Sequence, residues 1–95
     1  MSRDDQLVML KHDLQRTQKF TEQDAYLLAL LDDAAARIAE EGIDLMDTVR
    51  DGMLCVNYAA YLYRKRADSE GAMPRGLRWS LNQRLLAQKG GADVT

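Results

Sequence analysis

The sequence predicts an all-α fold, a small domain of four helices joined by short connections. Apolar residues recur at the three- and four-residue spacing of amphipathic helices, and no stretch alternates apolar and polar residues as a half-buried strand does. The longest charge-free run, Gly52–Tyr63, has twelve residues and would be apolar around most of a helix. Such a helix needs cover on most of its sides. We therefore expect it to be the central element of the domain, or to be half covered by another protein molecule.

The composition is ordinary for one soluble domain. The chain has 95 residues, of which 46% are hydrophobic and 29% are charged. Its single cysteine, Cys55, excludes an internal disulfide and agrees with a reducing compartment. No apolar run reaches the roughly 20 residues that span a bilayer, and the polar N-terminus carries no secretory signal. We therefore expect neither secretion nor association with a membrane.

Charge is distributed unevenly along the chain. The net charge is −2, but residues 1–51 carry six basic and twelve acidic side chains, whereas residues 52–95 carry seven basic and three acidic ones. This asymmetry is compatible with head-to-tail attraction between copies, with a basic face turned towards nucleic acid, or with an unevenly charged solvated surface.

The first two helices are predicted from their caps and from the spacing of their leucines. Asp4 or Asp5 caps a helix that runs to about Gln15, and Thr21 caps a second helix that Gly42 ends in the left-handed C′ position. The predicted buried stripes are Leu7, Leu10 and Leu14 in the first helix, and Leu27, Leu31, Ala34 and Ile38 in the second.

The central and last helices follow after short connections. Asp47 or Thr48 caps the central helix, which runs to about Ala67. A surface loop then leads to Pro74 at the first position of the last helix, and Gly90 ends that helix.

The predicted end of the last helix at Gly90 also predicts the domain boundary. The domain comprises residues 1–89, and residues 90–95 form a flexible C-terminal tail.

The chain offers poor candidates for catalysis. One histidine, His12, and one cysteine, Cys55, cannot form a zinc site and give no convincing Cys–His dyad. Cys55 falls inside the charge-free helix, where an inert buried thiol is the usual state. No glycine-rich phosphate loop is present. We therefore predict a protein without enzymatic activity, cofactor or metal.

Aromatic residues on the last two helices favour an interaction surface instead, because tyrosine and tryptophan are common anchors of protein interfaces. Tyr61 and Trp79 face away from the leucine stripes, so interface and core are equally good interpretations for them, whereas Tyr63 is expected in the core. The residues predicted at an interface are Leu54, Tyr58, Tyr61 and Trp79.

Six basic residues are predicted to contact assembly partners or DNA: Arg64, Lys65, Arg66, Arg75, Arg78 and Arg84. The first three also suit the C-terminal end of a helix, where cations complement the helix dipole. Arg75 and Arg78 lie at the start of a helix, where cations are unfavourable. They therefore require a carboxylate from elsewhere in the chain, a phosphate, or a neighbouring acidic subunit.

Three segments of the second half form an unusual combination: Tyr58–Arg66, Met73–Trp79 and Leu81–Leu85. Together they resemble the small head–tail connector, or head-completion, proteins of tailed bacteriophages. The resemblance extends over about Leu7–Lys89. It departs from the family at Gly76, where relatives usually carry a larger residue.

The resemblance implies a small α-helical protomer, without catalytic residues, that assembles into a ring. Such a ring docks below the portal of the filled capsid and carries the next tail-side protein, and a dodecamer would match the portal. The implied partners are further copies of the chain, the portal protein, the tail-side completion protein and DNA that passes through the centre. The implied locations are the head–tail junction of the virion and, during assembly, the cytoplasm of the bacterial host.

A small helical DNA-binding regulator is the alternative hypothesis, with Arg75, Arg78 and Arg84 as reading residues on the last helix. The sequence shows no clear helix-turn-helix spacing, and its pI of about 5.3 is low for such a protein. An enzyme completed by residues of a partner ranks last.

Overall fold

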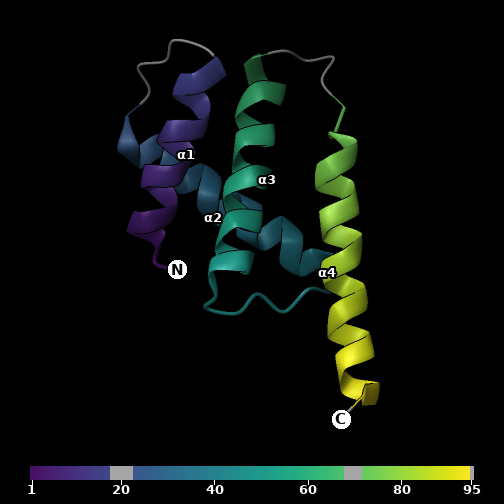
Figure 1. The fold of residues 1–95 in the computed structure, drawn as a ribbon. Helices are drawn as coiled ribbons and strands as arrows, with labels where there is room; N and C mark the ends of the chain where they lie inside the picture. The colour runs from purple at the N-terminus through teal and green to yellow at the C-terminus, as the bar shows by residue number, and fades with distance from the viewer. Residues whose placement is uncertain (18–22, 68–71, 95) are drawn as a thin grey trace.

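The chain forms four α-helices in the computed structural model, which describes residues 1–17, 23–67 and 72–94. They are α1 (Arg3–Thr17), α2 (Asp24–Glu40), α3 (Val49–Ala67) and α4 (Arg75–Val94), and the described ranges contain no strand. Helices α1, α3 and α4 lie side by side, and α2 crosses behind them (Figure 1). The predicted all-α class with four helices is confirmed.

The central helix of the fold is α3, which packs against α1, α2 and α4. Within its charge-free run, Val56, Ala59 and Ala60 are at most 1% exposed. The prediction that this run forms the central element is therefore confirmed, and most of its cover comes from the chain itself. The other fully buried large side chains of the core are Leu10, Leu14, Leu27, Leu31, Ile38, Ile43 and Leu81.

The ends of α1 and α2 differ in part from the sequence prediction. The backbone N–H of Asp5 donates to Ser2 Oγ at 3.1 Å, so Ser2 caps α1, and not Asp4 or Asp5. Thr21 lies outside the described residues, and α2 begins at Asp24 without a side-chain cap. The predicted end of α2 is confirmed, because Gly42 has a φ of +93°, a conformation that favours glycine.

The start of α3 agrees with the prediction, and the end of α4 does not. Thr48 Oγ1 accepts a hydrogen bond of 3.1 Å from the backbone N–H of Asp51, which makes Thr48 the cap of α3. Pro74 directly precedes α4, which continues through Gly90 to Val94. The predicted helix end at Gly90 is therefore wrong. A glycine costs only about 1 kcal/mol in a helix, which is too little to end one by itself.

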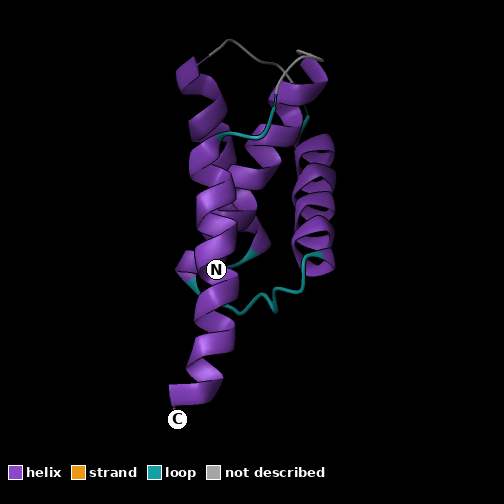
Figure 2. Cartoon of the chain, turned by 90° about the vertical axis from the view of Figure 1, so that its right-hand side faces the viewer, coloured by secondary structure: helices purple, strands orange, loops and turns teal. Residues whose placement is uncertain are grey.

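The molecule is elongated, with extents of 46 × 29 × 21 Å. The C-terminal part of α4 extends beyond the other three helices, which is visible from two directions (Figures 1 and 2). None of the helices in the described ranges has the length and apolar character needed to cross a membrane.

Two glycines allow a matched test of this fold. An added Cβ at Gly76 would meet no atom within 4 Å, so Gly76→Ala should raise the free energy of unfolding by about 1 kcal/mol, through the higher helix propensity of alanine. At Gly42 the positive φ makes the same substitution unfavourable, and Gly42→Ala should lower that free energy by about 1 kcal/mol. Urea denaturation of both variants measures the two changes. If both substitutions changed the free energy of unfolding in the same direction, the conformations assigned to Gly76 and Gly42 would be contradicted.

Candidate interaction groove

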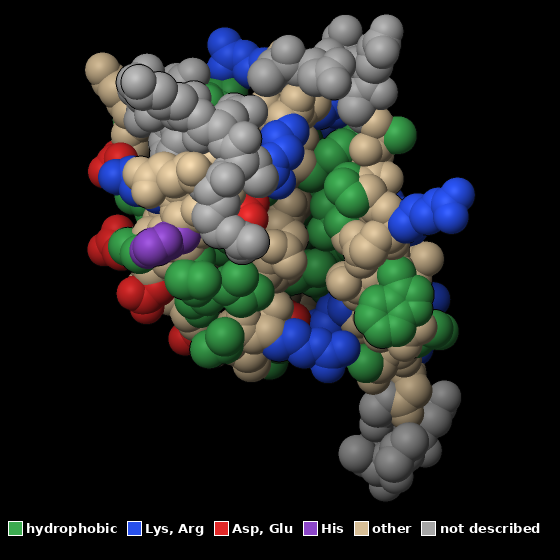
Figure 3. Space-filling model, turned by 45° about the horizontal axis from the view of Figure 1, so that its top comes forward, with side chains coloured by type: hydrophobic (Ala, Val, Ile, Leu, Met, Phe, Trp, Pro, Cys, Tyr) green, Lys and Arg blue, Asp and Glu red, His purple; other side chains and the backbone are tan. Residues whose placement is uncertain are grey.

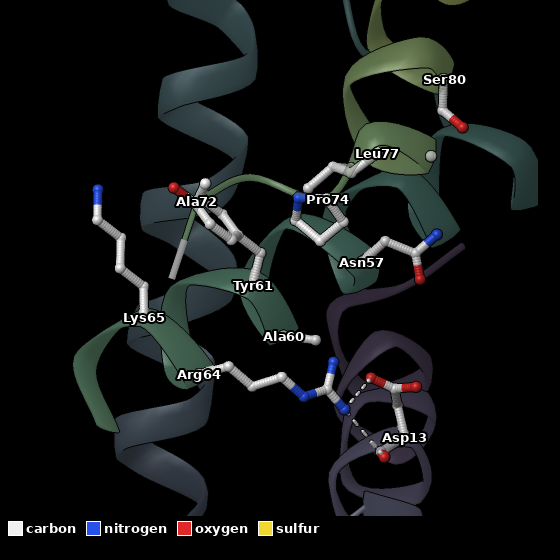
Figure 4. A pocket seen from close by; sticks show the side chains of 11 residues that line it. Asp13, Asn57, Ala60, Tyr61, Arg64, Lys65, Ala72, Pro74, Leu77 and Ser80 are labelled. Atoms are coloured by element: carbon white, nitrogen blue, oxygen red, sulfur yellow. Dashed lines mark hydrogen bonds and ion pairs between the residues drawn. The ribbon is translucent and has the colours of Figure 1, made fainter. Parts of the chain in front are cut away.

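A groove runs between α3 and α4. Its first part has a volume of about 400 Å³ and is bounded by α1, the second half of α3 and the first turns of α4 (Figure 4). Its lining includes Asp13, Asn57, Ala60, Tyr61, Arg64, Lys65, Pro74, Leu77 and Ser80. Its lining combines apolar side chains with polar and charged ones, a combination that protein interfaces also have.

The second part of the groove lies towards the start of α3 and has a volume of about 270 Å³. Asn57 and Ser80 line both parts, so the two hollows are adjacent and are together called the groove below. The other lining residues of the second part are Arg50, Asp51, Met53, Leu54, Trp79, Gln83 and Arg84. Hydrophobic side chains line the hollow beside α4, and Lys and Arg side chains stand around it (Figure 3).

Three large apolar side chains on the two helices that form the groove are exposed to solvent. Trp79 is 63% exposed on α4, and Val49, one turn before Met53 on α3, is 69% exposed. Leu86 continues the Trp79 side of α4 and is 60% exposed. Exposed side chains of this size close to a groove usually mark an interaction site.

A buried ion pair holds the two walls of the groove together. Arg84 donates from Nε to Asp51 Oδ1 at 2.8 Å and from Nη2 to Asp51 Oδ2 at 3.0 Å. The side chains are 12% and 3% exposed. Arg84 Nη2 also donates to the carbonyl oxygen of Asp44, and the backbone N–H of Met46 donates to Asp51, each at 2.7 Å. One carboxylate therefore connects α4, the start of α3 and the loop that precedes it.

The environment of Asp51 keeps this carboxylate ionised. Burial acts to raise the pKa of Asp51, but the hydrogen bonds from Arg84 and from the backbone of Met46 outweigh it, and the net pKa is lowered. The same hydrogen bond raises the pKa of Arg84. Both members of the pair are therefore charged at neutral pH.

A second set of contacts attaches α4 to the end of α2. Arg78 donates to the two carboxylate oxygens of Glu41 at 2.7 and 3.1 Å. Gln88 accepts from the backbone N–H of Asp44 at 2.7 Å and donates to the carbonyl oxygen of Gly42 at 2.9 Å. Of the three explanations open for Arg78, the structure therefore selects a carboxylate of the same chain.

The predicted interface residues divide into two groups. Leu54 and Tyr58 are 6% and 7% exposed and belong to the core, although Leu54 also lines the second part of the groove. The reason is that α3 is covered on both of its predicted apolar sides. Tyr61 is half-buried, with its ring edge-on to that of Tyr58 at 5.9 Å, and it lines the groove. Trp79 is the exposed member of the predicted set.

The predicted basic residues are mostly engaged within the chain. Arg64 donates to Asp13 Oδ2 at 3.1 Å, across to α1 (Figure 4). The Lys65 ammonium lies 5.8 Å from the centre of the Tyr61 ring, within the range of a cation–π contact. Arg66 makes the corresponding contact with Tyr26 at 4.8 Å. Arg75 is exposed at the start of α4. The structure therefore brings Arg64, Lys65 and Arg84 to the groove and places Arg78 beside Glu41, outside the lining of the groove.

Several groove residues were not predicted. Asn57 and Ser80 mark the middle of the groove, and Arg50 and Met53 mark one end. Asn57 carried a usable signal, since it is the one polar side chain besides tyrosine and cysteine in the charge-free run, and it is exposed. A polar residue in a helix that is otherwise buried indicates the side that faces solvent.

Two features of the described residues bear on reactive chemistry, the absence of a metal-binding cluster and the burial of Cys55. They contain no cluster of three or more His, Cys, Asp or Glu side chains that could bind a metal ion. Burial raises the pKa of the Cys55 thiol, an effect that Arg3 partly offsets, and the side chain is 3% exposed. A protonated, buried thiol is a poor nucleophile.

Comparisons with known proteins identify no relative. No family model, no curated protein and no solved structure matches the chain. The assignment of a function therefore depends on the groove and on the sequence resemblance.

The two ion pairs of α4 should differ strongly in their contribution to stability. Arg84→Ala leaves the buried Asp51 without its partner and should lower the free energy of unfolding by about 3 kcal/mol. Arg78→Ala removes a more exposed pair and should lower it by less than about 1 kcal/mol. Urea denaturation of both variants measures the difference, and similar losses would contradict the assigned role of Asp51.

Stability should also depend on the protonation of Asp51. Its pKa is lower in the folded chain than the usual value of about 3.9 in the unfolded chain, so its contribution is complete above about pH 4. The contribution is lost as the pH falls below that value through the folded pKa. Urea midpoints between pH 7 and pH 2.5 should fall more steeply for the wild type than for Asp51→Asn. Parallel curves would show that Asp51 does not contribute.

Proposed function

We propose that the chain is a non-enzymatic head–tail connector protein of a tailed bacteriophage or prophage. It forms a ring between the portal and the tail-side proteins, and DNA passes through that ring. The observation that carries this proposal is the uncovered groove between α3 and α4, with Trp79 63% exposed on its rim. A surface of this kind is suited to a protein whose role is to bind other proteins.

The segments that resemble connector proteins contribute residues to the same groove. Tyr58–Arg66 forms the second half of α3, and Met73–Trp79 and Leu81–Leu85 form the approach to α4 and its first half. These three segments supply Tyr61, Leu77 and Trp79 to the groove. The residues that resemble connector proteins therefore converge on the surface that the fold leaves open.

The charges favour a connector over a DNA-binding regulator. Arg78 and Arg84, two of the three proposed reading residues, are held by Glu41 and Asp51. Arginines engaged in this way are not available to read base edges. Passage of DNA through a ring requires only weak, sequence-independent electrostatics, which exposed cations such as Arg75 can supply.

The mass of the protein in solution tests the proposal. Native mass spectrometry over a concentration series, with and without a phage portal protein, should show multiples of the 10.8 kDa chain mass that increase with concentration or with the portal. A strict monomer under both conditions would contradict the connector. Filter binding at low salt tests the alternative, because tight and sequence-selective DNA binding would favour the regulator.

A further inference from the structure

The outer face of α1 is a second surface that the fold leaves uncovered. Val8 is 55% exposed and Met9 is 39% exposed, in the middle of the helix. One turn earlier, Asp4 and Asp5 are exposed, and neither forms an ion pair with any residue that the structure describes. This face, defined by Asp4, Asp5, Val8 and Met9, is called the α1 face below. It combines an acidic turn with an apolar turn.

The groove has the opposite charge. Its two carboxylates, Asp13 and Asp51, are already neutralised by arginines of the same chain. In contrast, Arg50 and Lys65 on its walls are exposed and form no ion pair within the described ranges. The charge left over in the groove is therefore positive, and an occupant that brings carboxylates is favoured.

The spacing of the two surfaces also matches. From Asp5 to Met9 is about one helical turn, or 6 Å. Arg50 and Met53 on α3 are also about one helical turn apart, at about 4.5 Å along the axis, and Trp79 lines the same part of the groove as these two residues. A helix that places its acidic turn beside Arg50 would therefore place its apolar turn against Met53 and Trp79.

We propose that the α1 face of one copy packs into the part of the groove between Arg50 and Trp79 of a second copy. Asp4 and Asp5 lie beside Arg50, and Val8 and Met9 cover the Trp79 ring. This proposal rests on the proposed function, since it names the contact by which a connector ring would form. It uses two different patches of each protomer, as the head-to-tail contact of a closed ring requires.

Two variants, each with one surface blocked, test this contact. Val8→Glu/Met9→Glu blocks the α1 face and leaves the groove intact, whereas Arg50→Glu/Trp79→Ala blocks the groove and leaves the α1 face intact. All four side chains are exposed, so the fold should persist, and circular dichroism checks this. Met46→Glu is the matched control, because Met46 is 62% exposed but lies outside both surfaces.

Each blocked variant alone should need at least about tenfold higher concentration than the wild type to assemble, as expected when an interface anchor is lost. An equimolar mixture of the two should form a heterodimer of twice the 10.8 kDa chain mass and nothing larger, because only one intact contact is available. The control variant should assemble as the wild type does. Native mass spectrometry distinguishes the species.

The outcomes separate this contact from the proposed function. If the wild type assembles and the blocked variants assemble equally well, or if their mixture forms no heterodimer, the contact is wrong and the connector proposal stands. If the wild type stops at two copies and the mixture still pairs, the contact is supported and the ring is contradicted. A wild type that stays monomeric both alone and beside a portal protein would overturn both proposals.

Discussion

The most buried ion pair of the described residues, Asp51 with Arg84, joins α4 to the start of α3. The helix packs mainly on α3, through Leu77 and Leu81, and this contact alone is narrow. A bidentate arginine–carboxylate pair is directional, so it fixes the rotation and the height of α4 as well as its proximity. Asp51 can serve this role because it is the third residue after the Thr48 cap, where a negative charge also complements the start of α3.

Ion pairs between the two halves of the chain account for part of its uneven charge. Three ion pairs each join a carboxylate of the first half to an arginine of the second half: Asp13 with Arg64, Glu41 with Arg78, and Asp51 with Arg84. Pairing inside the chain was predicted as one possibility for Arg75 and Arg78, but not as a consequence of the charge asymmetry as a whole. Because these pairs neutralise Asp13 and Asp51, the two carboxylates that line the groove, the exposed cations Arg50 and Lys65 give the groove its remaining positive charge.

The sequence predicted the elements well because local signals determined them. The charge-free run predicted a helix that needs cover on most of its sides, and Gly42 ended α2 through a conformation that other residues avoid. It predicted the surface less well, because helical spacing shows which residues share a face and not which neighbours cover that face. Leu54 and Tyr58 were covered by the rest of the chain, whereas Trp79 was not. The pairing of Arg84 with Asp51 could not be predicted either, because the two residues are 33 positions apart in the sequence.

The exposure of Trp79 follows from its position on α4 relative to the leucines of that helix. Leu77, Leu81 and the half-buried Leu85 recur every four residues and form one apolar side of the helix, which α3 covers. Trp79 is two positions from Leu77 and from Leu81, which on a helix is about 200° of rotation. Leu86, seven positions after Trp79, returns to the Trp79 side and is equally exposed. No rotation of α4 can therefore bury both sides against α3. No further helix of the described ranges lies over the second side, so Trp79 and Leu86 stay exposed to solvent.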